Sequence, residues 1–157
     1  MPNHVYQPRH SPPTWVDRVL VHPMETTVII ASVSFGAAVS LSMLVPGFVP
    51  SASMDKMPLL VVILVALSLV AGGVLSLVGL HWSGQLAKGW AIERFGWLLS
   101  FGGFSAFGAT VLLFYPTSFF SWGIPLVLGL GCLLRIWSVS RIESTFRLTQ
   151  HLKELTA

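Results

Sequence analysis

Residues 58–80 read PLLVVILVALSLVAGGVLSLVGL, a stretch of 23 residues that contains no Asp, Glu, Lys or Arg. A hydrocarbon core about 30 Å thick needs roughly 20 helical residues to cross it, and a helix satisfies its backbone hydrogen bonds internally. The stretch begins with Pro58, which fits the first turn of a helix because no hydrogen-bond donor is needed there. It is therefore long and apolar enough to span a membrane.

Three further runs of the chain have the same character. They cover residues 26–45, 95–115 and 119–140 and are 20, 21 and 22 residues long. The first two hold no acidic or basic residue, and the last holds only Arg135. The last two are joined by Tyr115-Pro116-Thr117-Ser118, a turn so short that the two helices must be antiparallel neighbours. The sequence predicts an all-α, polytopic membrane protein with four transmembrane helices.

The shortage of charge in the whole chain agrees with this class. Only 10% of the 157 residues are charged, against about 25% in soluble domains. Fourteen of the fifteen formal charges lie outside the four runs, so the chain lacks the charge to cover a soluble surface. This excludes an ordinary cytosolic enzyme, a nucleic-acid-binding module and a disordered tail.

The sequence also lacks the motifs of common active sites. It holds no phosphate loop, dinucleotide fingerprint, zinc-protease motif or nucleophile elbow. Its five histidines have no paired metal-ligand spacing, and the single cysteine, Cys132, lies inside the last run. We therefore expect no enzymatic activity, no cofactor and no metal site.

The basic residues predict the orientation. Four spans place eight of the nine basic residues on or near one side, and Lys56 alone on the other. The eight are Arg9, Arg18, Lys88, Arg94, Arg135, Arg141, Arg147 and Lys153. Short basic segments resist translocation, so both termini are expected in the cytoplasm and the protein in the cytoplasmic (inner) membrane. The expected partners are the lipid bilayer and anionic lipids at its cytoplasmic face, with no nucleic acid.

Three regions follow from these boundaries. Residues 1–25 form a polar cytoplasmic arm with a candidate interfacial helix, residues 26–140 the transmembrane domain, and residues 141–157 an amphipathic helical tail. An alternative treats the first run as a signal peptide cleaved near Ser51-Ala52-Ser53. The run and the region before it are longer than usual for such a peptide, which favours a retained helix.

Residues 81–94 form the most distinctive polar segment between spans. An in-plane amphipathic segment would place its aromatic side chains at the headgroups, either to fix the topology or to recognise a lipid or partner. The adjacent Glu93 and Arg94 would pair with each other or hold a partner's carboxylate or a lipid phosphate. The candidate contacts at this interface are Trp82, Lys88, Trp90, Glu93, Arg94 and Trp97.

Small residues recur four apart in three of the runs. Such stripes let helix backbones approach closely in a membrane, where lipid and leucine are equally apolar. They would serve packing inside one bundle or the formation of a homo-oligomer. The candidate packing residues are Ser32, Gly36, Ser40, Ser68, Gly72, Ser76, Gly96, Ser100, Gly102 and Ala106.

Arg135 is the one ionisable residue inside a span. It lies six residues before Arg141, which is about 9 Å along a helix. From that depth its side chain would either extend to the inner headgroups or form a buried functional pair, for instance with Glu93 or Glu25.

One run carries a family resemblance. The segment from Trp90 to Trp97 has the pattern W-x-x-E-R-x-G-W and leads into a Gly-rich, aromatic span that ends at a Tyr-Pro turn. The chain here resembles small multi-span membrane proteins of actinobacteriophages and actinobacteria, over roughly residues 79–142. Some of these lie among lysis functions, which implies a holin-like role in the host cell membrane if the chain is phage-encoded. The long polar N-terminal arm and the four spans depart from the usual holin pattern.

Three function classes follow. The first is holin-like permeabilisation by oligomerisation, and the second is an accessory subunit or scaffold that binds a larger complex through the cytoplasmic loop and tail. A small transporter that depends on Arg135 is the third and the least supported.

Overall fold

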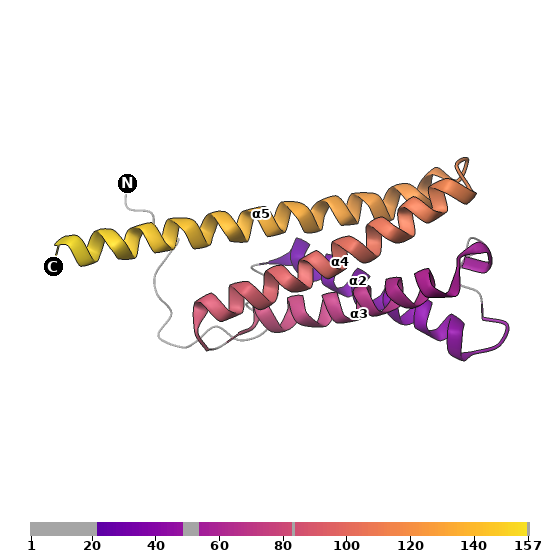
Figure 1. Ribbon diagram of the computed structural model, residues 1–157, viewed down its shortest axis with the longest axis horizontal. Helices are drawn as coiled ribbons and strands as arrows, with labels where there is room; N and C mark the ends of the chain where they lie inside the picture. Colours follow the sequence, from indigo (N-terminus) through magenta and orange to yellow (C-terminus); the bar gives the residue numbers. More distant parts are fainter. Residues whose placement is uncertain (1–21, 49–53, 83, 157) are drawn as a thin grey trace.

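The computed structural model of the protein describes residues 22–48, 54–82 and 84–156, and these are almost entirely helical (Figure 1). The elements are α2 (Pro23–Leu44), the 3-10 turn η2 (Met54–Lys56), α3 (Leu59–Leu80), α4 (Leu86–Phe114) and α5 (Phe119–Thr156). All four α-helices are long and apolar enough to cross a membrane, which confirms the predicted four-span fold. The expected interfacial helix before Pro23 and the cleavage site at 51–53 lie outside the described residues.

The start of α4 differs from the prediction. The sequence suggested a polar interface segment over residues 81–94, but helix α4 already begins at Leu86. Residues 86–94 are rich in helix-forming Leu, Ala, Lys, Glu and Arg, so the helix extends through them. The predicted loop therefore shrinks to a short turn, and α4 is 29 residues long.

Helices adjacent in sequence pack side by side, whereas the first and last are nearly apart. α2 packs on α3, α3 on α4 and α4 on α5, but α2 and α5 barely touch. Figure 1 shows α5 running along α4 and extending past the ends of the other helices at its C-terminus. The bundle is consequently open between α2 and α5.

The contact between α3 and α4 is the closest in the bundle. A Cβ built on Gly72 would lie 2.6 Å from the backbone nitrogen of Ser100, and one built on Gly96 would meet the backbone nitrogen of Ser76. Only glycine allows these backbones to approach so closely. We call this contact between α3 and α4 the seam. Ser32 of α2 contacts both of its helices, because its Oγ donates to the carbonyl oxygen of Leu69 at 2.8 Å and lies 3.0 Å from the Oγ of Ser100.

Most of the predicted packing residues lie in these interfaces. Ser40 and Ser68 are half-buried, and the hydroxyl of Ser40 donates to a carbonyl of its own helix. The fully buried members are Ser32, Gly36, Gly72, Ser76, Gly96 and Ser100.

The prediction was wrong for Gly102 and Ala106, which are exposed on the outer face of α4. A Cβ built on Gly102 would meet nothing within 4 Å. Gly102 follows Ser100 by two residues, or about 200° around the helix, so it faces away from the seam that Ser100 occupies. The buried face instead continues through Gly103 and Phe107.

Candidate functional site

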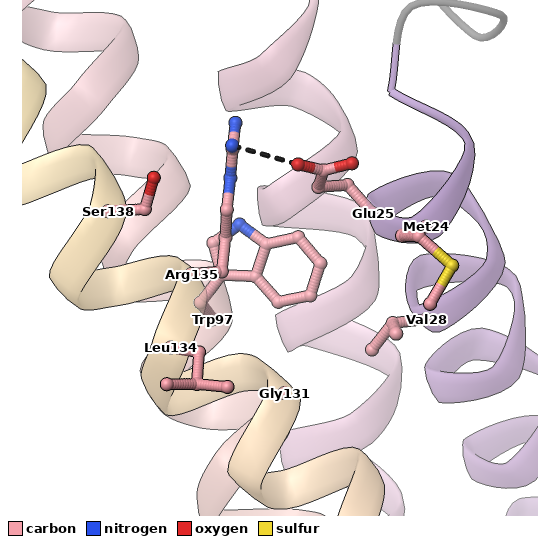
Figure 2. A pocket seen from close by; sticks show the side chains of 8 residues that line it. All are labelled: Met24, Glu25, Val28, Trp97, Gly131, Leu134, Arg135 and Ser138. Atoms are coloured by element: carbon pink, nitrogen blue, oxygen red, sulfur yellow. Dashed lines mark hydrogen bonds and ion pairs between the residues drawn. The ribbon is translucent and has the colours of Figure 1, made fainter.

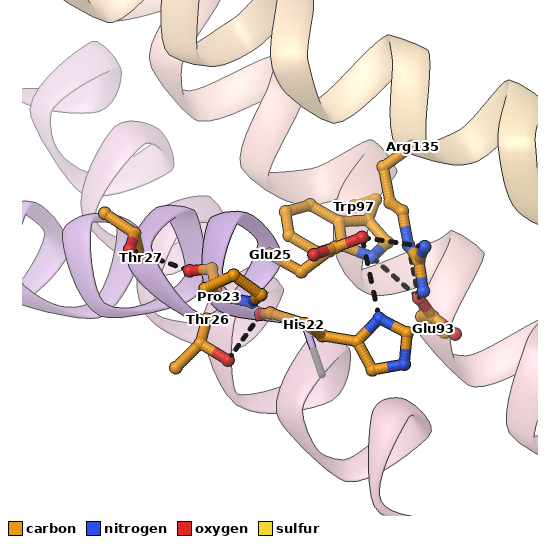
Figure 3. A network of polar contacts seen from close by, with 8 residues as sticks. All are labelled: His22, Pro23, Glu25, Thr26, Thr27, Glu93, Trp97 and Arg135. Carbon is orange, nitrogen blue, oxygen red and sulfur yellow. Dashed lines mark hydrogen bonds and ion pairs between the residues drawn. The ribbon is translucent and has the colours of Figure 1, made fainter. Parts of the chain in front are cut away.

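A single arginine joins three helices at one end of the bundle. Arg135 of α5 donates from Nε to Oε1 of Glu93 on α4 at 2.9 Å, and from Nη1 to Oε1 of Glu25 on α2 at 2.9 Å (Figure 3). Its Nη2 lies 2.8 Å from the same Glu93 oxygen. We call these three residues, Glu25, Glu93 and Arg135, the charged cluster.

The cluster is largely hidden from its surroundings. The exposed fractions of its side chains are 5% for Glu93, 15% for Arg135 and 22% for Glu25. Trp97, one turn after Glu93, is 1% exposed and its Nε1 donates to Glu93 Oε1 at 3.3 Å. A buried charge without a partner is costly, so the cluster is sustained by the pairing of opposite charges and by this additional donor.

Local sequence positions one carboxylate of the cluster, and a tertiary contact positions the other. Glu25 lies in the first turn of α2, where the helix dipole favours a negative charge, and the Nδ1 of His22 is 3.8 Å from it. Glu93 is set by the close approach of α3, since a Cβ built on Gly79 would meet the backbone of Glu93. The cluster thus depends on the same small-residue seam that packs α3 against α4.

The structure shows Arg135 paired with both of the carboxylates that the sequence named as possible partners, Glu93 and Glu25. These residues are 42 and 110 positions away from Arg135 in the chain.

A second ion pair fixes the beginning of α4 to α5. Arg94 Nη2 lies 2.8 Å from Oε2 of Glu143, which is buried. Next to it, the rings of Trp90 and Phe146 meet edge to face with centroids 5.6 Å apart. The adjacent Glu93 and Arg94 therefore pair with two different residues of α5, and not with each other as the sequence had suggested.

The predicted interface contacts divide into three groups. Glu93 and Trp97 are buried inside the bundle, so their assignment as lipid or partner contacts was wrong, because the continuous α4 turns them toward α5 and α2. Trp82 and Lys88 are exposed, as expected of interface residues. Trp90 and Arg94 are half-buried against α5.

The ion pair of Glu143 was not predicted from the sequence. The helical spacing of Cys132, Val139 and Glu143 could have indicated that the three residues share one face of the helix. In the structure all three are buried. This buried face of α5 continues past Arg141, where the predicted span had already ended.

A cavity of about 270 Å³ lies beside the charged cluster, in the opening between α2 and α5 (Figure 2). Met24 and Val28 of α2 form one wall, α5 forms the other, and Trp97 of α4 lies between them. The cavity combines apolar walls with the paired charges of Glu25 and Arg135, so it suits a ligand that is apolar over part of its length. Within the part of the chain that the structure describes, no group of His, Cys, Asp or Glu is arranged to hold a metal ion.

Comparison of the chain with protein-family models, curated proteins and solved structures gave no significant match.

Proposed function

We propose that this integral membrane protein is a non-enzymatic accessory subunit, which binds a larger complex through the part of α5 that extends beyond the other helices. The observation that carries the proposal is the continuity of α5 over 38 residues, from Phe119 to Thr156. After Gly131 the helix contains neither Gly nor Pro, so nothing in its sequence bends it into the membrane plane. It therefore projects from the bundle, and we call this C-terminal part of α5, which contains Ile142, Thr145 and Leu148, the α5 arm.

The base of this arm is packed against α4, and its surface is partly apolar. The Arg94–Glu143 ion pair and the Trp90–Phe146 contact hold it against α4. Ile142 and Leu148 are nevertheless 50% and 65% exposed. Apolar side chains in water favour contact with a partner surface, and on the orientation predicted from the basic residues this arm lies in the cytoplasm.

The test is a pull-down of the full chain from membranes in mild detergent, comparing the wild type with an Ile142→Glu, Leu148→Glu double variant. One defined partner should copurify with the wild type and decrease at least about tenfold in the double variant, since two apolar contacts are replaced by charge. Thr145→Glu is the matched control, because it adds a carboxylate at an exposed polar position of the same arm. Recovery of homo-oligomer or monomer alone, or equal recovery of the partner with both variants, would contradict the proposal.

Holin-like permeabilisation is the second candidate, and the exposed small residues Gly102 and Ala106 favour it. An exposed stripe of this kind suits close contact with a second copy in the membrane. Most of the other predicted small residues pack against helices of the same chain. Only the face with Gly102 and Ala106 is therefore left for contact between copies, so the holin-like role is less well supported than the accessory role.

Membrane potential separates the two candidates. If the protein is holin-like, inducible expression should depolarise cells and stop growth, and Ala106→Leu should suppress depolarisation at equal protein level. A wild type that leaves the potential unchanged at high expression rejects the holin-like role and leaves the accessory role standing.

A further inference from the structure

The cavity between α2 and α5 opens toward the surroundings of the bundle and not into its core. Its two walls come from the helices that barely touch, and residues of these walls such as Met24 and Leu134 are exposed at 73% and 56%. For a helix bundle in a membrane, such a surface faces lipid. The ligand that fits must therefore reach the cavity from the bilayer.

The size of the cavity selects among membrane components. The cavity measures about 270 Å³, close to the lower end of the roughly 300–1,000 Å³ typical of small-molecule sites. It therefore suits a small group such as a phospholipid headgroup or a segment of an acyl chain.

The charges beside the cavity indicate which type of headgroup it binds. The charged cluster holds two carboxylates and one guanidinium, so an additional anion alone is repelled and a cation is attracted. Glu25 is its most exposed member and borders the cavity. Arg135 also borders the cavity. Its guanidinium carries five N–H groups. Three of them face Glu25 and Glu93, so two remain to donate to a further acceptor.

We infer that this cleft binds the headgroup of an amine-bearing zwitterionic phospholipid, of the phosphatidylethanolamine type. The ammonium group donates to Glu25, the phosphate accepts from Arg135, and the acyl chains follow the apolar wall formed by Met24, Val28 and Leu134. Arg135 lies about 9 Å along α5 from Arg141, which places the cluster near the boundary of headgroups and acyl chains. A choline headgroup has no N–H to donate, and a glycerol headgroup leaves the phosphate charge unbalanced, so both bind less well.

Lipid binding to the delipidated full chain in detergent tests this inference. Phosphatidylethanolamine, phosphatidylcholine and phosphatidylglycerol with identical acyl chains are added at equal concentration, and bound lipids are counted by native mass spectrometry. The ethanolamine lipid should be retained about tenfold more than the choline lipid, as expected for one charge-assisted hydrogen bond. Glu25→Gln should remove most of this difference.

A second variant blocks the cleft and leaves the charges intact. A Cβ built on Gly131 would meet nothing within 4 Å, so Gly131→Leu fits the helix while its side chain fills the cavity. It should lower ethanolamine-lipid binding as far as Glu25→Gln does, whereas Ala71→Leu, at an exposed position of α3, should not. Equal retention of the ethanolamine and choline lipids by the wild type overturns the inference. So does a result in which the variants lower the binding of the glycerol lipid alone, or in which Gly131→Leu leaves the binding of the ethanolamine lipid unchanged.

Discussion

Replacing Gly96 by leucine should destabilise the bundle by about 3 kcal/mol, the upper end of the usual cost of overpacking that forces the backbone to shift. A Cβ at this position would meet the backbone nitrogen of Ser76 and would lie 2.8 Å from the carbonyl oxygen of Gly72. Neither atom belongs to a flexible side chain, so α3 and α4 must separate. The measurement is unfolding of the purified protein in detergent, followed by circular dichroism or by a fluorescent thiol probe at Cys132.

Gly102→Leu is the matched control for this prediction. It is the same substitution in the same helix, but no atom lies within 4 Å of the added Cβ. Its stability should equal or slightly exceed that of the wild type, since glycine is a poor helix former. Equal destabilisation by the two substitutions would show that α3 and α4 do not meet at Gly96.

Arg135→Leu should also be strongly destabilising, by about 3–5 kcal/mol, the usual cost of removing one partner from a buried ion pair. The substitution leaves Glu93 and Glu25 without their shared cation, and Glu93 is almost wholly buried. Arg135→Lys should recover only part of the loss, because an ammonium group cannot reproduce the three contacts of the planar guanidinium. The same unfolding measurement checks both variants.

Arg141→Leu provides the comparison for Arg135→Leu. Arg141 belongs to the same helix but is exposed, with its guanidinium 5.3 Å from the centre of the Trp137 ring. Its replacement should change stability by less than about 1 kcal/mol, the upper range for an exposed cation on an aromatic ring. If Arg135→Leu is as mild as Arg141→Leu, Arg135 is not held in a buried cluster.

The sequence predicted the helices well because hydropathy and length alone determine whether a segment can cross a membrane. It also predicted that Gly72, Ser76, Gly96 and Ser100 would pack helices, because small residues at four-residue spacing lie on one face. It failed at Gly102 and Ala106, which have the same spacing on the opposite face. Spacing alone does not determine which face of a helix has a neighbour.

The charged cluster was only half predictable. The isolation of Arg135 within a span was compatible with extension to the headgroups or with a buried pairing, and Glu93 and Glu25 were named as examples of possible partners. The burial of Glu93 depends on the tertiary contact with Gly79 and on the unbroken start of α4. The opening between α2 and α5 likewise follows from how the helices associate, which local sequence does not encode.

Arg135 and Glu93 should be energetically coupled across α4 and α5, and a double-mutant cycle measures this coupling. Unfolding free energies are compared for the wild type, Arg135→Leu, Glu93→Leu and the double variant in detergent. The double variant should be more stable than the sum of the single losses implies, by about 1–3 kcal/mol, because it leaves neither charge of this pair unpartnered. Losses that add within about 0.5 kcal/mol would mean that Arg135 and Glu93 do not interact and that the charged cluster does not hold α4 and α5 together.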